Sequence, residues 1–112
     1  MQDARFEIYR KRVDFIQKHI FPGGMLPSPG ALRDEVRRAG LQVSRSIEFG
    51  ESYSQTLRRW YDAFNGHWDE ISRLGFDDRF WRMWNLYLTS SAGAFHCGNC
   101  DVTQITITRP AV

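Results

Sequence analysis

The sequence predicts an α/β fold in the order α-α-β-α-α-β, with two strands and about four helices. Three observations support this prediction. Apolar residues recur at helical spacing in residues 6–20 and again in residues 53–95. Residues 41–49 alternate between apolar and polar, and residues 102–109 are rich in β-branched side chains, which is typical of strands. The high aromatic content, 14%, and 42% hydrophobic residues exclude a wholly disordered chain.

The first predicted helix is amphipathic and covers residues 6–20, with Asp3 as a candidate N-cap. Its apolar face consists of Phe6, Tyr9, Val13, Ile16 and Ile20. Residues 21–30 hold three of the four prolines and cannot continue the helix, because proline lacks the amide hydrogen that a helix needs. We therefore expect an ordered loop there.

Ser28 followed by Pro29 is typical of an N-cap and first helical position, so a short second helix is predicted, closed by Gly40. The strand at 41–49 follows. Its odd positions are apolar except Arg45, which predicts one buried face. Gly50 is expected to end the strand.

The longest predicted helix runs from Tyr53 to Leu74, and Asn65-Gly66 is expected to kink or split it, because glycine inside a helix is unfavourable. Asp77 is the predicted cap of a last helix, which the strand at 102–109 follows. Two strands alone make a marginal sheet, and four helices would over-cover it. The chain is therefore expected to be part of a larger α/β domain.

Composition excludes several classes of protein. The formal charge of +2 is too small for a nucleic-acid-binding footprint, so no nucleic-acid partner is expected. No apolar run approaches the length of a membrane-spanning helix, and the N-terminus lacks the apolar region of a signal peptide. Two cysteines do not suggest a disulfide scaffold. We expect a soluble intracellular protein.

The motif Cys97-Gly98-Asn99-Cys100 is compatible with a redox pair or with half of a zinc site. It follows a predicted helix and has no second CxxC partner, which favours a simple helix-to-strand turn. Neither a GxGxxG nor a Walker loop is present. We therefore expect neither a metal site nor a cofactor-binding loop in this chain. The aromatic stripes at helical spacing are typical of a core.

Four segments together resemble the cyclopropane-fatty-acyl-phospholipid synthases and their mycolic-acid relatives. Residues 14–28, Asp-Phe-Ile-Gln-Lys-His-Ile-Phe-Pro-Gly-Gly-Met-Leu-Pro-Ser, are similar to one family signature. Residues 49–60 resemble the block G-x-x-Y-x-x-T-L-x-x-W, and residues 75–88 resemble a third block. Residues 92–104 resemble the closing block. These segments follow the family's order and cover nearly the whole chain.

The resemblance implies that residues 1–112 are the C-terminal segment of a class I S-adenosylmethionine-dependent methyltransferase, a Rossmann-like fold. The two strands would then be its sixth strand and its antiparallel seventh. The cofactor-binding half would lie upstream, so the chain alone is expected to bind no cofactor and to be inactive. Because its strands would normally border a larger sheet, we expect the chain to form a homodimer or otherwise self-associate.

In the family, S-adenosylmethionine gives a methyl group to a cis double bond of a phospholipid acyl chain, and a bound bicarbonate removes a proton. The resemblance places Tyr53 at the family's bicarbonate-orienting tyrosine. From spacing alone, Tyr53 is equally well a core residue at the start of the long helix. The other expected site residues would form an acyl-channel wall, and they are Leu57, Trp60, Phe64, Phe80, Trp84 and Tyr87. The resemblance implies a cytoplasmic enzyme peripheral to the inner membrane face.

The chain departs from the family pattern at three places. Ser52 stands where many relatives have histidine, Ser90 or Ser91 where many have cysteine, and Cys100 where isoleucine is common. Some relatives methylate or hydroxymethylate their substrates instead of cyclising them. The alternative to an enzyme segment is a free-standing helical module that binds lipid or another protein.

Overall fold

The computed structural model describes residues 1–12 and 14–111. Its helices are α1 (Asp3–Tyr9), η1 (Ile16–Ile20), α2 (Pro29–Arg38), α3 (Gly50–Gly66), α4 (Trp68–Ser72) and α5 (Asp78–His96). The strands are β1 (Gln42–Glu48) and β2 (Thr103–Thr108). The molecule is elongated, with extents of 58 × 28 × 27 Å. The α/β composition and the chain order of the main elements confirm the prediction.

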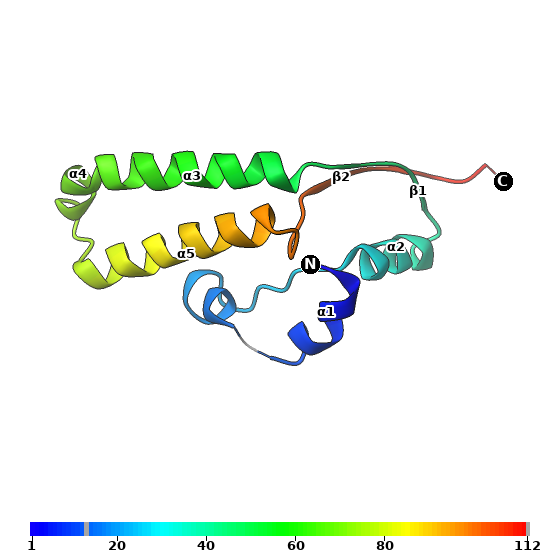
Figure 1. The fold of residues 1–112 in the computed structure, drawn as a ribbon. Coiled ribbons are helices and arrows are strands. Elements are labelled where there is room, and N and C mark those ends of the chain that lie inside the picture. The colour runs from blue at the N-terminus through cyan, green and yellow to red at the C-terminus, as the bar shows by residue number, and fades with distance from the viewer. Residues whose placement is uncertain (13, 112) are drawn as a thin grey trace.

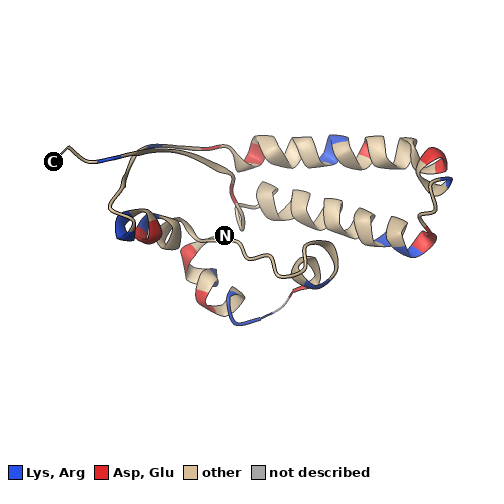
Figure 2. Ribbon diagram, turned by 180° about the vertical axis from the view of Figure 1, so that it is seen from behind, with Lys and Arg blue, Asp and Glu red and all other residues tan. Residues whose placement is uncertain are grey.

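Two parts of the fold determine this shape (Figure 1). On one side, α3 and α5 lie side by side as an arm that α4 closes at its far end. On the other side, β1 and β2 form an antiparallel two-stranded ribbon that leads to the C-terminus. The α2 helix packs on β1, and α1 and η1 form a lobe below α5. Figure 2 shows the same arrangement from behind, with a basic turn directly after α1.

The local signals at helix starts are confirmed. Ser28 is the N-cap of α2, and its hydroxyl accepts a hydrogen bond from the Ala31 amide at 3.2 Å. Asp77 is the N-cap of α5, and its carboxylate accepts from the Phe80 amide at 3.0 Å. The predicted split of the long helix is also found, since α3 ends at Gly66 and α4 begins at Trp68.

The continuous helix predicted over residues 6–20 is wrong. The α1 helix ends at Tyr9, and a separate π-helical turn, η1, holds Ile16 to Ile20; Val13 lies outside the described residues. The Tyr9 hydroxyl accepts a hydrogen bond from the Leu26 amide at 3.0 Å. This contact ties the end of α1 to the proline-glycine loop.

Asp3 is not the N-cap of α1, because Gln2 occupies that position and Asp3 is the first helical residue. Its carboxylate instead accepts from the Gly30 amide at 2.8 Å. The hydrogen bonds from Ser28 and from this amide lower the pKa of Asp3. Asp3, predicted as a local cap, therefore links α1 to α2 instead.

The apolar side chains of the ribbon and of the helical arm differ in how far they are buried. The prediction of one buried face on the first strand is wrong, since Ile47 is 41% exposed and a bulge between Val43 and Arg45 breaks the alternation. In the arm, Leu57, Leu88 and Ala92 form the core between α3 and α5. Apart from Val36 of α2, the buried apolar side chains of the described chain therefore lie in the helical arm.

Candidate functional site

Tyr53 occupies the first turn of α3, at the junction with the ribbon. Its amide donates to the Phe49 carbonyl at 3.1 Å, so the helix starts immediately after β1. The ring packs edge-on against Phe95 of α5, with centroids 4.9 Å apart, and against Trp60, at 5.9 Å. These contacts with α3 and α5 residues fix the orientation of the ring.

The backbone at this junction is held by Asp101, which precedes β2. One carboxylate oxygen of Asp101 accepts from the Gly50 amide at 2.7 Å and from the Val102 amide at 2.9 Å. A Cβ at residue 50 would lie 3.1 Å from the Asp101 Cα, so only glycine allows this approach without a shift. The start of α3, and with it Tyr53, is therefore anchored to the ribbon.

Tyr87 lies on α5 and packs on the same core cluster as Tyr53. Its ring is edge-on to Trp84, at 5.3 Å between centroids, and to Phe21 of the proline-glycine loop, at 5.9 Å. Burial, and secondly the nearby Tyr53, raise the pKa of Tyr87 above its ordinary value. Like any tyrosine with an ordinary or raised pKa, Tyr87 keeps its proton at physiological pH and can donate a hydrogen bond.

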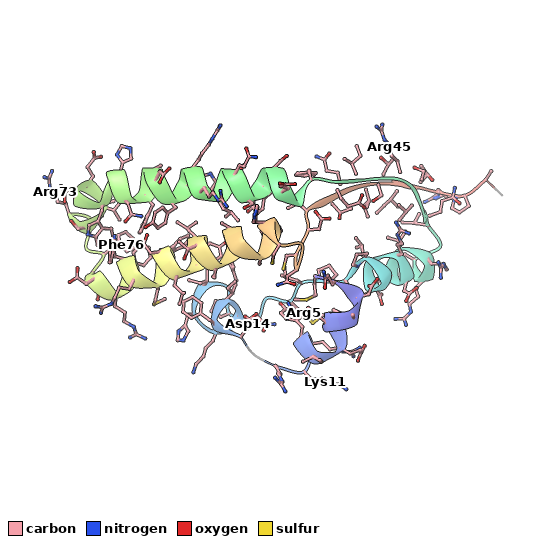
Figure 3. The ribbon with its side chains drawn as sticks, viewed as in Figure 1. Arg5, Lys11, Asp14, Arg45, Arg73 and Phe76 are labelled. Atoms are coloured by element: carbon pink, nitrogen blue, oxygen red, sulfur yellow. The ribbon has the colours of Figure 1, made fainter. Side chains whose placement is uncertain are left out.

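Aromatic rings continue from Tyr87 toward the far end of the arm. Phe80 contacts Trp84 at 5.7 Å and Phe64 of α3 at 6.2 Å, and Phe64 also lies 6.4 Å from Trp84. Phe76 adds a ring 4.4 Å from Phe80, at the α4 end of the helix pair (Figure 3). We call this set the aromatic row, and its members are Phe21, Phe64, Phe76, Phe80, Trp84 and Tyr87.

The structure thus brings most of the sequence-predicted wall residues together. Phe64, Phe80, Trp84 and Tyr87 belong to the aromatic row, and each is half-buried. Trp60 is 49% exposed and touches Tyr53. Leu57 differs from the others because its side chain is fully buried between α3 and α5. In this chain it packs as a core residue.

Sequence reasoning missed three ring contacts of this site. Phe95 touches Tyr53, Phe21 touches Tyr87, and Phe76 extends the row. Phe95 shares the apolar stripe of the last helix, and that stripe could have indicated it. No sequence signal pairs Phe21 with Tyr87, because the loop conformation decides that contact.

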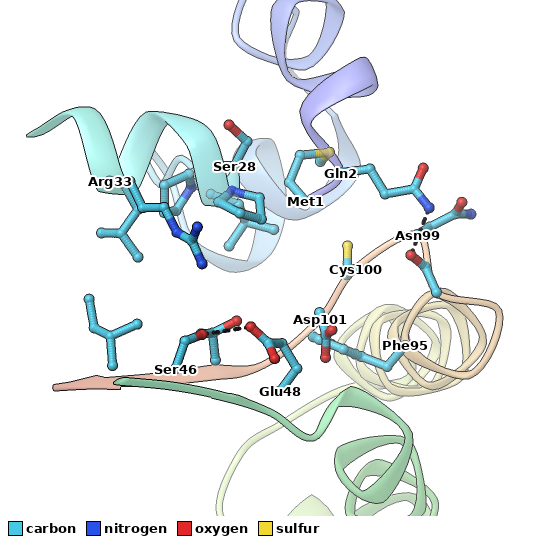
Figure 4. A pocket seen from close by; sticks show the side chains of 17 residues that line it. Met1, Gln2, Ser28, Arg33, Ser46, Glu48, Phe95, Asn99, Cys100 and Asp101 are labelled. Carbon is cyan, nitrogen blue, oxygen red and sulfur yellow. Dashed lines mark hydrogen bonds between the residues drawn. The ribbon is translucent and has the colours of Figure 1, made fainter. Parts of the chain in front are cut away.

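A cavity of 320 Å³ lies beside this site, between the N-terminus, the start of α2 and the ribbon (Figure 4). Glu48, Cys100 and Asp101 contribute to its lining, and the Ser46 hydroxyl donates to Glu48 at 2.6 Å within it. Tyr53 is not part of the lining. Phe95 lines the cavity and also packs against Tyr53.

The cysteine motif forms the predicted turn between α5 and β2, with Gly98 at φ +81°. Cys97 is exposed, Cys100 is half-buried, and both are free thiols. In the part of the chain that the structure describes, no group of three or more His, Cys, Asp or Glu side chains is placed to hold a metal ion. No helix in the described ranges is long and apolar enough to span a membrane.

Comparison with known proteins identifies relatives of this chain. The chain is 43% identical over 110 residues to the tuberculostearic acid methyltransferase UfaA1 of Mycobacterium tuberculosis, covering 97% of this chain and 26% of that protein. It is 35% identical to the cyclopropane-fatty-acyl-phospholipid synthase of Escherichia coli, covering 85% of this chain and 24% of the relative. The chain therefore spans about a quarter of the length of these relatives.

Solved structures agree with these relationships. The mycolic acid cyclopropane synthase CmaA1, complexed with SAH and CTAB, superposes with a TM-score of 0.80 at 30% identity, over 94% of this chain and 35% of that one. The cyclopropane synthase MmaA2 of Mycobacterium tuberculosis gives a TM-score of 0.79 at 28% identity, over 94% of this chain and 34% of that one. The family model described as mycolic acid cyclopropane synthetase matches residues 1–105. This chain belongs to the mycolic acid cyclopropane synthetase family of methyltransferases.

Proposed function

We propose that this chain is the C-terminal segment of an S-adenosylmethionine-dependent enzyme that cyclopropanates unsaturated acyl chains of phospholipids. The observation that carries the proposal is the aromatic row along the α3–α5 arm, together with Tyr53 and Tyr87, which pack on the same core cluster from the two helices. A continuous set of aromatic rings, four of them half-buried, suits an apolar chain better than a polar substrate. The family membership of the chain supports this reading.

Within this proposal, Tyr53 orients a bicarbonate ion and Tyr87 supports the same region. S-adenosylmethionine supplies the methyl group and bicarbonate supplies the base when the two are bound. A phenol hydroxyl is a suitable donor to a bicarbonate oxygen, and it can also moderate positive charge that develops nearby. The edge-on contacts with Phe95 and Trp60 hold the Tyr53 ring in one orientation. Tyr53 therefore has the fixed position that an orienting donor needs.

The acyl-channel wall, within the same proposal, consists of the predicted residues with Leu57 behind them as support. The rings of Phe64, Phe80 and Trp84 present half-exposed apolar surface. Leu57 holds α3 against α5 from the core side. The wall is thus one helix pair, with Leu57 in its core and half-buried aromatic rings along it.

A chimera tests the proposal directly. The segment of the tuberculostearic acid methyltransferase that aligns with this chain is replaced by the present 112 residues. We expect the chimera to transfer a labelled methyl group from S-adenosylmethionine to an oleoyl phospholipid, and a version without the segment to transfer none. Because a cyclopropane and a methylated alkene are isomers of equal mass, proton NMR of the lipid product separates cyclopropanation from methylation through the cyclopropyl and alkene signals.

Two outcomes contradict the proposal. A chimera that folds and binds S-adenosylmethionine but transfers no methyl group removes the enzymatic role. If the 112-residue chain then still binds unsaturated phospholipid by itself, the alternative of a free-standing lipid-binding module replaces it. The folded state of the chimera is checked by its cooperative thermal melt.

The proposal also implies that the chain alone binds no S-adenosylmethionine and is inactive. Its sequence contains no glycine-rich strand-turn-helix to hold the methionine and ribose of the cofactor. Titration calorimetry of the chain with S-adenosylmethionine should show no binding heat. Saturable binding at low micromolar concentration contradicts this part.

We infer in addition that the chain self-associates as a homodimer. The ribbon has only two strands, and it leaves Ile47 and Ile107 more than 40% exposed. Open strand edges with apolar side chains favour association with a second copy. Sedimentation equilibrium should show a species heavier than 13.1 kDa, and a single 13.1 kDa species contradicts the inference.

A further inference from the structure

We propose that Asn65 of α3 and Asn85 of α5 are positioning residues, which hold the two helices in register and so decide which double bond of an acyl chain lies at Tyr53. Neither asparagine belongs to the predicted acyl-channel wall, and the sequence alone marks Asn65 only as part of a helix break. The inference rests on the proposed function, because it names the residues that select the acyl chain at that site.

The side-chain amide of Asn65 joins α3 to α5 by two hydrogen bonds. Its Nδ2 donates to the Asn85 Oδ1 at 2.7 Å, and its Oδ1 accepts from the Trp81 indole N–H at 3.0 Å. Nδ2 also donates to the Tyr61 carbonyl at 2.9 Å, one turn back in α3. Both polar atoms of the amide are therefore bonded, and the three contacts hold the side chain in a single orientation.

A further hydrogen bond between the helices lies toward the other end of their apolar contact. The Ser54 hydroxyl, which is 1% exposed, donates to the Ala92 carbonyl of α5 at 2.8 Å. Ser54 and Asn65 are about three helical turns apart on α3, a length over which Figure 1 shows α3 and α5 side by side. The core residues Leu57 and Leu88 lie between them. Directional contacts thus flank the apolar core of the arm on both sides.

The apolar core by itself does not define the register of the two helices. Burial of apolar surface is non-directional, so a helix that slides along its partner exchanges one set of apolar contacts for another. A hydrogen bond is lost in such a shift, and a buried acceptor without a donor is unfavourable. A buried asparagine fixes the register of coiled coils in this way. The Asn85 Nδ2 is buried without a hydrogen-bond partner among the described residues, so the bond from Asn65 is what satisfies this side chain.

The register matters because the candidate site is divided between the two helices. Phe64 and Trp84, whose ring centroids lie 6.4 Å apart, directly precede the two asparagines. The hydrogen bond therefore holds these two rings of the aromatic row next to each other. Tyr53 belongs to α3, so a slide by one helical turn, about 5.4 Å, would move it past the rings of α5 by several carbon atoms of an extended acyl chain. The register therefore sets which part of the acyl chain the tyrosine meets.

Spin labels on the complete chain measure the register. Labels are attached at Arg58→Cys of α3 and Leu86→Cys of α5, two exposed positions, after both native cysteines are replaced by serine. Labelled chain is diluted with unlabelled chain, so that only distances within one molecule are recorded. We expect a single narrow distance distribution for this chain. Asn85→Leu, which removes the acceptor, should add a population displaced by about 5 Å, one helical turn.

The same substitution in the methyltransferase chimera tests the selection of acyl chains. Phospholipids that carry oleoyl or cis-vaccenoyl chains differ only in the position of the double bond. We expect the chimera to prefer one of the two, and Asn85→Leu to lower the ratio of their kcat/KM values at least about threefold. A loss of stability alone would lower both values together and leave their ratio unchanged.

Two variants separate the bond between the helices from other properties of the side chains. Asn85→Asp keeps an acceptor oxygen for the Asn65 amide, so the single distance and the substrate preference should both be retained. Thr89→Val removes a hydroxyl that donates within α5, to the Asn85 carbonyl at 2.7 Å, and should change neither readout. Each variant is first checked for a cooperative melt. If Asn85→Leu is unfolded, Asn65→Leu/Asn85→Leu replaces it, because that pair leaves neither amide without its partner.

Three results overturn the proposal. The first is an unchanged distance distribution in Asn85→Leu. The second is an active chimera that has no preference between the two phospholipids, or whose preference does not respond to Asn85→Leu, and this result leaves the proposed function in place. The third is the same loss in Asn85→Asp or Thr89→Val, which would show a general disturbance of α5. An inactive chimera removes the proposed function and the selection of acyl chains with it, while the spin-label distances still decide whether the two asparagines hold the register.

Discussion

Asp101 and Gly50 join the ribbon to the helical arm through one carboxylate oxygen, which accepts a hydrogen bond from the Gly50 amide at 2.7 Å. The same oxygen accepts the Val102 amide at 2.9 Å, and the Phe49 amide donates to the Val102 carbonyl nearby. The start of α3 and the start of β2 are therefore held as one unit. Tyr53 lies one turn into α3, so its position depends on this unit.

Replacing Asp101 by alanine should destabilise the chain by about 1–3 kcal/mol, because two backbone amides lose their acceptor and the Gly50 amide is shielded from water. Urea unfolding measures the change. Asp62→Ala, on the exposed side of α3, should stay within about 0.5 kcal/mol and serves as the control. Equal effects of the two substitutions would show that the Asp101 contact contributes nothing specific.

Leu57→Ala should cost about 3–5 kcal/mol of folding stability, because Leu57 is fully buried between α3 and α5 and a cavity would remain. The same substitution at Leu74, which is 77% exposed, should change stability by no more than about 0.5 kcal/mol. Chemical denaturation of both variants gives the comparison. A loss below 1 kcal/mol for Leu57→Ala, on the scale of an ordinary surface change, would mean that the helix arm is not the core of the chain.

Structural features that depend on residues close in the sequence were predicted correctly. Features that depend on contacts between distant residues were missed. The caps at Ser28 and Asp77 are confirmed because a cap binds an amide only three residues ahead. The end of α1 was missed because the apolar spacing continues past Tyr9, whereas the folded chain joins Tyr9 to Leu26, 17 residues away. No local pattern contains that contact.

The same distinction applies to the candidate site. Helical spacing placed Phe64, Phe80 and Trp84 on facing stripes, and the structure brings them into contact. The resemblance, and not the spacing, singled out Tyr53. The contact between Tyr87 and Phe21 joins a helix to a distant loop, and its geometry follows only from the folded chain.

The stability of the chain should fall as pH rises above about 10, in part through Tyr87. Burial, and secondly Tyr53, raise the pKa of Tyr87 above its ordinary value of 10.0. The unfolded chain therefore loses this proton at a lower pH than the folded chain does, so alkaline conditions favour unfolding. Thermal melts from pH 8 to 11 should show a smaller decline for Tyr87→Phe than for the unaltered chain. Parallel declines would mean that the Tyr87 proton is not linked to folding.

The two cysteines should be dispensable for catalysis. Cys97 is exposed and Cys100 is half-buried, on a turn that only links α5 to β2. In the chimera, Cys97→Ser/Cys100→Ser should keep methyl transfer within about threefold, well under 1 kcal/mol on the transition state. Metal analysis of the purified chain should find no stoichiometric zinc. A larger loss of activity, or one zinc per chain, would restore a functional role for the motif.

Tyr53→Phe should lower methyl transfer by the chimera about 100-fold or more, because one oriented donor is removed from a shielded site. The phenylalanine ring keeps the contacts with Phe95 and Trp60, so folding and lipid binding should not change. The control is Tyr61→Phe, which removes the hydroxyl of an exposed tyrosine on the same helix. Turnover and vesicle binding are measured for both variants. If Tyr53→Phe turns over like the unaltered chimera, the hydroxyl is dispensable and Tyr53 serves only as packing at the start of α3.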